Sequence, residues 1–144
     1  MSILQWSIPG ARVVDLFSGS GALGLEALSR GAAFVDFVEV DPRSIKSLEA
    51  NIAGLGASGR CALHRQDAIE FVTARVAEPP FDLAFADPPY RLDYATRLAG
   101  CWLAAPFSAI FGVEHERSAT MPEGGDRRNY GATALTIYRN LDAR

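Results

Sequence analysis

The feature that most constrains this chain is a regular alternation of short apolar runs with amphipathic stretches of helical length. Such alternation is typical of strands joined by crossover helices, which form a mostly parallel sheet with helices on both faces. The predicted strands are Arg12–Phe17, Ala33–Glu39, Cys61–Arg65, Phe81–Ala86 and Ala109–Glu114, and the predicted helices are Ala22–Arg30, Pro42–Leu55, Ala68–Val76 and Tyr94–Leu103. We therefore expect a doubly wound α/β fold.

The C-terminal part of the chain departs from this alternation. The stretch Glu116–Asp126 is polar and rich in glycine, which predicts a loop. After it, Ala134–Arg139 alternates between apolar and polar residues, so we expect an antiparallel strand that returns beside Ala109–Glu114. The expected sheet is therefore mostly parallel, with one antiparallel C-terminal strand.

Composition limits the class of protein. The chain has 144 residues, of which 49% are hydrophobic and 22% charged, as expected for one globular domain spanning residues 1–144. Cys61, Cys101, His64 and His115 lack the spacing of a disulfide framework or a metal site, so we expect no metal. Without a membrane-length apolar run or a signal pattern, a cytoplasmic protein with no membrane contact is expected. The net charge of −3 argues against a strongly basic nucleic-acid module, although a local basic rim would suffice for binding.

The first predicted strand runs into a glycine-rich turn that a helix follows. The residues Asp15-Leu-Phe-Ser-Gly19-Ser-Gly21-Ala-Leu-Gly24 match the pattern G-x-G-x-x-G. Glycines let the backbone approach a ligand closely, while the helix start presents free N–H groups. A purely structural strand-to-helix turn would give the same match. Asp15 favours a ligand, because a carboxylate inside an apolar strand needs a partner. It either orients the turn or accepts a hydrogen bond from a ligand ammonium.

Carboxylates also follow the next two predicted strands. Glu39 ends the second strand at about the spacing expected for a nucleoside-binding unit, where a carboxylate can accept hydrogen bonds from both ribose hydroxyls. We therefore favour ribose binding for Glu39 over a solvated strand end. For Asp41 we favour a helix cap over a ligand contact. Asp67, followed by Ala68, could accept from an adenine amino group, cap the next helix, or do both.

The fourth predicted strand ends in Asp87-Pro88-Pro89-Tyr90. Each proline removes an N–H donor and restricts the backbone. The result is a rigid loop that exposes two acceptors, the Asp87 carboxylate and the Pro88 carbonyl. Tyr90 adds a flat face on which a base can stack. Acceptors beside a stacking ring suit an exocyclic amine of a nucleobase. A plain turn could have the same residues, but at the end of the fourth predicted strand we favour the binding role.

Together these motifs resemble those of a known family. Asp15–Gly24 with Glu39, Asp67 and Asp87–Tyr90 is similar to the S-adenosylmethionine-dependent amino-methyltransferases that carry an (Asp/Asn/Ser)-Pro-Pro-(Tyr/Phe/Trp) motif. A closer resemblance, to the RsmD-like bacterial 16S rRNA guanine-N2 methyltransferases, rests on three segments: D-L-F-S-G-S-G-A-L-G-L-E-A-L-S-R-G-A (Asp15–Ala32), the later F-V-E-V-D, and Arg128-Asn-Tyr130-Gly131 before the last strand. It covers nearly the whole chain, whereas D-P-P-Y is shared with N6-adenine DNA methyltransferases.

The resemblance implies a Rossmann-like methyltransferase domain that binds S-adenosylmethionine and methylates the N2 amine of a guanine in 16S rRNA. It implies that the catalytic residues are Asp87, Pro88, Pro89 and Tyr90. It implies that the cofactor-binding residues are Asp15, Phe17, Ser18, Gly19, Gly21, Glu39, Val40, Asp41, Asp67, Ala68 and Asp87. The expected partner is rRNA or the small ribosomal subunit, and the expected state is a monomer.

One departure concerns the N-terminus. Members of this family usually carry a longer basic N-terminal segment with an Arg-Pro-Thr stretch, which is thought to help hold RNA and the target base. Here Met1 stands shortly before the first predicted strand. Either the domain is truncated at its N-terminus, which we favour, or this member of the family is shortened. In both cases we expect weakened substrate binding and reduced activity.

The mechanism that the resemblance implies is direct methyl transfer to an exocyclic nitrogen, with no metal and no covalent intermediate. Asp87 and the Pro88 carbonyl would accept the amine hydrogens, and the base must be unpaired or flipped out to reach them. Three alternatives remain open. An N6-adenine DNA methyltransferase shares the chemistry but usually needs a target-recognition domain. An NAD-dependent dehydrogenase would share the glycine turn and Glu39 but leave Asp87–Tyr90 unexplained. The third alternative is an inactive binding module.

Overall fold

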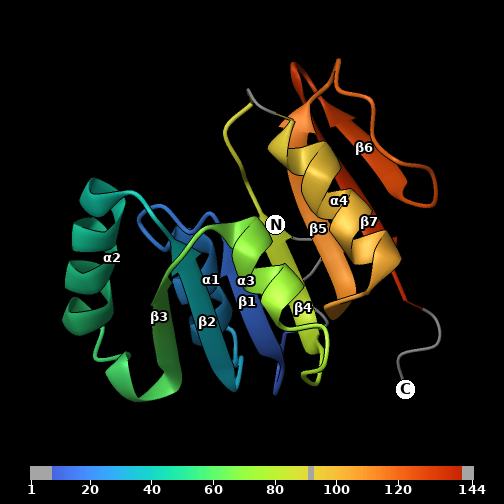
Figure 1. The fold of residues 1–144 in the computed structure, drawn as a ribbon. Coiled ribbons are helices and arrows are strands. Elements are labelled where there is room, and N and C mark those ends of the chain that lie inside the picture. Colours follow the sequence, from blue (N-terminus) through green and yellow to red (C-terminus); the bar gives the residue numbers. More distant parts are fainter. Residues whose placement is uncertain (1–7, 91–92, 141–144) are drawn as a thin grey trace.

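A computed structural model describes residues 8–90 and 93–140, and a seven-stranded sheet runs through it (Figure 1). The strands are β1 (Arg12–Leu16), β2 (Phe34–Glu39), β3 (Cys61–Arg65), β4 (Phe81–Ala86), β5 (Ser108–Glu116), β6 (Asp126–Tyr130) and β7 (Thr133–Arg139). The helices are α1 (Ala22–Ser29), α2 (Pro42–Gly54), α3 (Ala68–Ala74) and α4 (Tyr94–Ala104), with one 3₁₀ turn at Ser58–Arg60. All the predicted strands and helices are present, with small differences at their ends.

Helices cover both faces of the sheet, as the alternation predicted. Successive strand residues point to opposite faces, so two separate apolar clusters form. One cluster joins α1 and α2 to strand residues such as Val13 and Phe37, and the other joins α3 and α4 to residues such as Val14 and Val38. In Figure 1, α3 and α4 lie in front of the sheet and α1 lies behind it. No helix within residues 8–90 and 93–140 is long and apolar enough to cross a membrane.

The strand order is β3-β2-β1-β4-β5-β7-β6. The chain therefore moves outward from β1 to β3, then returns to place β4 on the other side of β1. The first five strands are parallel, and their carboxyl ends meet along one edge of the sheet. Ligands of doubly wound folds bind at this edge, in the crevice where the strand order reverses. Here that crevice lies between the ends of β1 and β4.

The predicted antiparallel return is confirmed, because β7 pairs with β5 in the antiparallel direction. The loop predicted after β5 is also present, but it leads into a strand that was not predicted. This strand, β6, forms an antiparallel hairpin with β7 around Gly131, whose φ is +64°. All five residues of β6 are exposed, so the segment carries no apolar alternation. Backbone pairing to β7 holds β6 at the sheet edge. Such pairing leaves no periodic pattern in the sequence, so β6 could not be predicted from it.

The predicted first strand extended to Phe17, whereas β1 ends at Leu16. Phe17 has a left-handed backbone with φ of +57°, which ends the extended conformation. This conformation costs a residue with a Cβ about 1–2 kcal/mol, so the surrounding packing must hold it in place. Phe17 therefore begins the glycine-rich turn instead of ending the strand.

We expect Gly24→Ala to destabilise the fold, because α1 packs closely against β2 at this residue. A Cβ on Gly24 would lie 2.9 Å from Cζ of Phe37 and 3.0 Å from Cγ1 of Val35. Overpacking of this kind costs about 1–3 kcal/mol of unfolding free energy. Urea unfolding followed by circular dichroism would measure it.

Gly100→Ala is the matched control, because Gly100 lies within α4 and its added Cβ would meet no heavy atom within 4 Å. It should raise the unfolding free energy by about 0.4–1 kcal/mol, since alanine restricts the unfolded chain. Equal effects of the two substitutions would contradict the close packing of α1 against β2.

Candidate functional site

The glycine turn and the diproline corner (Asp87–Tyr90) lie side by side at the carboxyl edge of the sheet. Leu16, the last residue of β1, pairs with Ala86, the last residue of β4. The two segments that follow these residues therefore leave neighbouring strands at the same level. The two segments also interact electrostatically, because the charge of Asp87 contributes to the raised pKa of Asp15. The corner thus faces the glycine turn, as a shared site requires.

Backbone conformation explains the glycines of the turn. Gly19 and Gly21 have φ values of +58° and +88°, in the left-handed region that favours glycine. Gly21 is also the N-cap of α1, although it offers no side-chain cap. The first N–H groups of α1 therefore need other partners or a ligand. One of them, that of Gly24, donates to Oδ2 of Asp15 at 3.0 Å.

Asp15 is a buried carboxyl on β1, with 2% of its surface exposed. Loss of hydration raises its pKa to about 8. The hydrogen bond from Gly24 opposes this rise, and the charges of Glu39 and Asp87 add to it. Of the two predicted roles for Asp15, the hydrogen bond fulfils the first, which is to orient the turn. No ion pair of Asp15 occurs within the ranges that the structure describes.

Glu39 ties the glycine turn to the end of β2. Its Oε1 accepts the Gly19 N–H at 2.7 Å, and its Oε2 accepts the N–H groups of Val40 and Asp41 at 3.0 Å each. A carboxylate has about four acceptor positions, so three contacts leave room for one more. Ser18 adds a second link, because its Oγ accepts the Val38 N–H at 3.1 Å. These contacts hold the turn against β2.

Asp41 and Asp67 cap the helices that follow them. Asp41 accepts hydrogen bonds from the Ser44 N–H at 3.0 Å and the Ser44 hydroxyl at 2.9 Å, and Pro42 occupies the first position of α2. Asp67 accepts from the Glu70 N–H at 3.1 Å through one of its two oxygens. The cap predicted for each residue is therefore confirmed. The second oxygen of Asp67 makes no hydrogen bond within residues 8–90 and 93–140.

The remaining predicted residues differ in exposure. Ala68 is buried at the start of α3, whereas Val40 exposes 58% of its surface at the carboxyl edge. An exposed valine between two carboxylates offers an apolar surface to a ligand lying over the end of β2. Pro88 is buried, and Tyr90 is 47% exposed. Partial burial also raises the pKa of Asp87.

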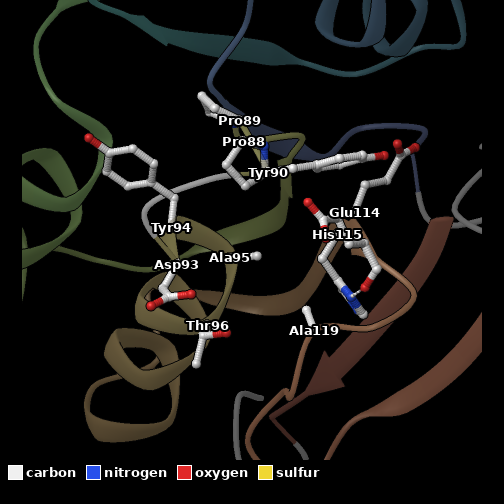
Figure 2. Close-up of a pocket in the computed structure, with 11 residues that line it drawn as sticks. Pro88, Pro89, Tyr90, Asp93, Tyr94, Ala95, Thr96, Glu114, His115 and Ala119 are labelled. Atoms are coloured by element: carbon white, nitrogen blue, oxygen red, sulfur yellow. Dashed lines mark hydrogen bonds between the residues drawn. The ribbon is translucent and has the colours of Figure 1, made fainter. Parts of the chain in front are cut away.

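A small pocket opens beside the diproline corner (Figure 2). Three parts of the chain line it: Pro88–Tyr90, the start of α4 from Asp93 to Thr96, and the end of β5 with Ala119 beyond it. The ring of Tyr94 also packs on Phe17, with ring centroids 5.2 Å apart, and so links the glycine turn to α4. The pocket and the glycine turn therefore share a wall.

The histidines predicted to be structural make contacts within the chain. His115 lies in the pocket wall, where its Nδ1 is 2.7 Å from the Glu116 carbonyl and its Nε2 is 2.7 Å from the Thr136 hydroxyl. Burial lowers the pKa of His115, which favours the neutral ring. Nε2 of His64 lies 2.7 Å from Oδ1 of Asp36, a residue of β2. No group of three or more potential metal ligands occurs in the part of the chain that the structure describes.

Sequence reasoning missed Glu114 and Tyr94. Glu114 was assigned only as a strand end, and Tyr94 only as a helix start. A signal for Glu114 did exist, because it is the last residue of a predicted apolar strand, as Glu39 is. A signal for Tyr94 did not exist, because its contact with Phe17 depends on how α4 crosses the sheet.

The site is electronegative. Asp15, Glu39 and Asp87 form no ion pairs within residues 8–90 and 93–140. Asp87 likewise raises the pKa of Glu114, second to the effect of burial. Carboxylates held this close, with no ion-pair partner among the described residues, favour a positively charged ligand, whose binding would relieve their repulsion.

We expect Asp15→Asn to change how stability depends on pH. Between about pH 4 and pH 8, Asp15 is protonated in the folded state and ionised in the unfolded state. The contribution of Asp15 to the wild-type unfolding free energy therefore falls as pH rises through this window, by about 1.4 kcal/mol for each pH unit. Asparagine cannot ionise, and its amide oxygen can still accept the Gly24 N–H.

The measurement is urea unfolding of both proteins at several pH values. The advantage of Asp15→Asn over the wild type should be small near pH 5 and should grow until about pH 8. A difference that does not change with pH would show that Asp15 has an ordinary pKa in the folded protein.

Known proteins share both sequence and fold with this chain. It is 29% identical over 147 residues to the Ribosomal RNA small subunit methyltransferase D of Haemophilus influenzae, covering 96% of this chain and 76% of that protein. A solved structure of a Thermus protein of unassigned function is 31% identical, with a TM-score of 0.81, and the match covers 95% of this chain and 79% of that chain. A SAM-dependent methyltransferase from Agrobacterium tumefaciens, 14% identical with a TM-score of 0.74 over 96% of this chain and 60% of that one, shares the fold.

A family model agrees with these matches over almost the whole sequence. The family described as Conserved hypothetical protein 95 matches residues 1–139. That range includes the glycine turn, the carboxylates after β2 and β3, and the diproline corner. The chain therefore belongs to this family, the RsmD-like methyltransferases, as its sequence motifs predicted.

Proposed function

We propose that this protein transfers a methyl group from S-adenosylmethionine to the exocyclic N2 amine of a guanine in 16S rRNA. The observation that carries the proposal is the pairing of Leu16 with Ala86, which sets the diproline corner beside the glycine turn. Membership of the RsmD-like family supports methyl transfer. The name of the Haemophilus influenzae relative supports small-subunit rRNA as the substrate.

The residues at the carboxyl edge fit S-adenosylmethionine, which carries a sulfonium and an ammonium. Asp15, with its raised pKa and its lack of a cation among the described residues, suits the ammonium, because that charge would stabilise the ionised carboxylate. Glu39 has acceptor capacity left for a ribose hydroxyl. The free oxygen of Asp67 suits an adenine amino group, and exposed Val40 suits the flat face of the adenine.

The other predicted cofactor residues hold this site together. Ser18 fastens the turn to β2 through its hydroxyl, Asp41 caps α2, and Ala68 is buried as the first residue of α3. Their side chains therefore support the backbone that meets the cofactor. Phe17, Gly19 and Gly21 contribute through backbone positions with positive φ.

When bound, S-adenosylmethionine supplies an electrophilic methyl group on its sulfonium. The lone pair of an aromatic amine is delocalised into the ring, which makes the amine a poor nucleophile. The Asp87 carboxylate and the Pro88 carbonyl accept its two hydrogens and so favour a localised lone pair. They also stabilise the positive charge that develops on nitrogen, an electrostatic contribution that preorganised acceptors provide at low cost. Asp87 then accepts the proton that the amine loses.

Tyr90 holds the target base in place. Its ring is exposed at the corner, and stacking of a base on such a ring contributes about 1–3 kcal/mol. Buried Pro88 and the adjacent Pro89 keep the ring and the acceptors in one rigid arrangement. A base within a duplex cannot reach this corner, so the substrate guanine is unpaired or flipped out. We propose that the chain acts as one domain and as a monomer in the cytoplasm.

Asp87→Asn should reduce the methyl-transfer rate to small ribosomal subunits by about 100-fold or more, because the amide lacks the charge that stabilises the developing cation. The affinity for S-adenosylmethionine should change little. The rate would be measured under single-turnover conditions with labelled methyl donor, and the affinity by calorimetry.

Asp82→Asn is the matched control at the opposite end of β4. Asp82 accepts the Arg12 N–H at 2.8 Å, and an asparagine oxygen can accept it equally. This control should keep the wild-type rate. Full turnover by Asp87→Asn would refute the proposed catalytic role of Asp87.

Calorimetry with two cofactors separates the proposed function from the dehydrogenase alternative. We expect S-adenosylmethionine to bind and NAD to show no heat of binding. Carboxylates that form no ion pair with a described residue favour a cationic ligand over the anionic pyrophosphate. Binding of NAD without affinity for S-adenosylmethionine would end the methyltransferase proposal. Donor binding with no transfer to rRNA would point to the inactive binding module, and transfer to DNA adenine would point to an N6-adenine DNA methyltransferase.

A further inference from the structure

Glu114 lies beside Asp87 at the carboxyl edge. Ala86, the last residue of β4, pairs with Val113 of β5, so the residues that follow these two, Asp87 and Glu114, stand at the same level. Neighbouring strands lie about 4.8 Å apart, which places the two residues within the width of one nucleobase. Glu114 also lines the pocket that Pro88 and Tyr90 form.

The carboxylate of Glu114 is half-buried and makes no hydrogen bond or ion pair within the described ranges 8–90 and 93–140. Its neighbours on β5 are engaged, because His115 bonds to Thr136 and Glu116 accepts from the Ser118 hydroxyl at 3.2 Å. Figure 2 shows the Glu114 carboxylate near the hydroxyl end of the Tyr90 ring, and its charge raises the pKa of that hydroxyl, after burial and Asp87. The pocket therefore contains an acceptor that, among the described residues, serves neither the fold nor the proposed mechanism.

The chemistry of nucleobases suggests what such an acceptor could contact. In guanine, the exocyclic N2 amine stands next to the ring N1–H, a second donor on the same edge. In adenine and cytosine, the ring nitrogen next to the exocyclic amine carries a lone pair instead. A carboxylate beside the amine-binding acceptors would therefore bind guanine and repel the other two bases.

We propose that Glu114 is the specificity-determining residue of this site, and that its carboxylate accepts the N1–H of the target guanine while Asp87 and the Pro88 carbonyl accept the N2 hydrogens. This inference rests on the proposed function. A carboxylate at N1–H also pushes electron density into the ring, which makes the N2 amine a better nucleophile. Glu114 thus connects base selection with reactivity.

The test compares wild type, Glu114→Gln and Glu114→Ala, with Glu26→Gln as control. Glu26 lies on α1, where it pairs with Arg30 at 3.0 Å and is half exposed. Single-turnover transfer to small ribosomal subunits gives the rate, calorimetry gives the affinity for S-adenosylmethionine, and thermal unfolding checks the fold.

A second substrate pair measures specificity directly. Single-stranded RNAs carry either one guanine or one 2-aminopurine at the same position. 2-Aminopurine keeps the exocyclic amine at C2, but its N1 bears a lone pair in place of N–H. The wild type should prefer guanine, and Glu114→Gln should narrow this preference by about 10- to 100-fold, because its amide can donate to N1. Intrinsic differences between the two amines cancel when the ratios of the two enzymes are compared.

The outcomes separate the two proposals. Two results would support the role of Glu114: a loss of about 10- to 100-fold in transfer to subunits, and the narrowed preference for guanine. The affinity for S-adenosylmethionine and the unfolding temperature should stay unchanged. Subunit rates and base preference equal to those of the wild type would overturn it. If Glu114→Ala does not fold, the isosteric Glu114→Gln decides. If none of the enzymes uses the short RNAs, the subunit rate at unchanged cofactor affinity decides. A wild type that binds no S-adenosylmethionine, or transfers no methyl group to subunits, would instead refute the proposed function.

Discussion

The pairing of β1 with β4 is the constraint on which the site depends. The chain moves outward to β3 and then returns to the other side of β1. No other strand therefore separates the glycine turn from the diproline corner. The fully buried residues of β1, such as Val13 and Val14, are held by neighbours on both sides and on both faces. The loops that follow β1 and β4 therefore start from fixed points, and a rigid corner can present its acceptors to a ligand held by the turn.

The site keeps its carboxylates together at an electrostatic cost. Asp15 lies in the interior without a cation among the described residues, and the charges of Glu39 and Asp87 add to the cost of its ionisation. Phe17 adds backbone strain at the same place. Unfavourable terms of this kind collect at functional sites, where binding of a complementary ligand can relieve them. Hydrogen bonds from Gly19 to Glu39 and from Gly24 to Asp15 keep the turn in place meanwhile.

Most of the fold followed from local patterns. The apolar strands, the caps at Asp41 and Asp67 and the return of β7 all have signals within a few residues of sequence. β6 had none, because its five exposed residues are held by backbone pairing alone. The left-handed Phe17 was also missed, because a phenylalanine after an apolar strand looks like its continuation. Tyr94 was missed because its contact with Phe17 joins distant parts of the chain. Glu114 ends a predicted strand, but the strand pattern does not show that it lies level with Asp87.

The sequence by itself determined the class of fold, the family and the chemical character of the site. It could do so because strand periodicity, glycine turns and a diproline corner are local properties of the backbone. Only the tertiary structure decided which carboxylates share one crevice and which serve mainly to hold the chain. Burial and strand order set those roles: burial raises the pKa of Asp15, and pairing to β5 brings Glu114 level with Asp87. Neither burial nor strand order can be read from neighbouring residues, because both depend on contacts between segments far apart in sequence.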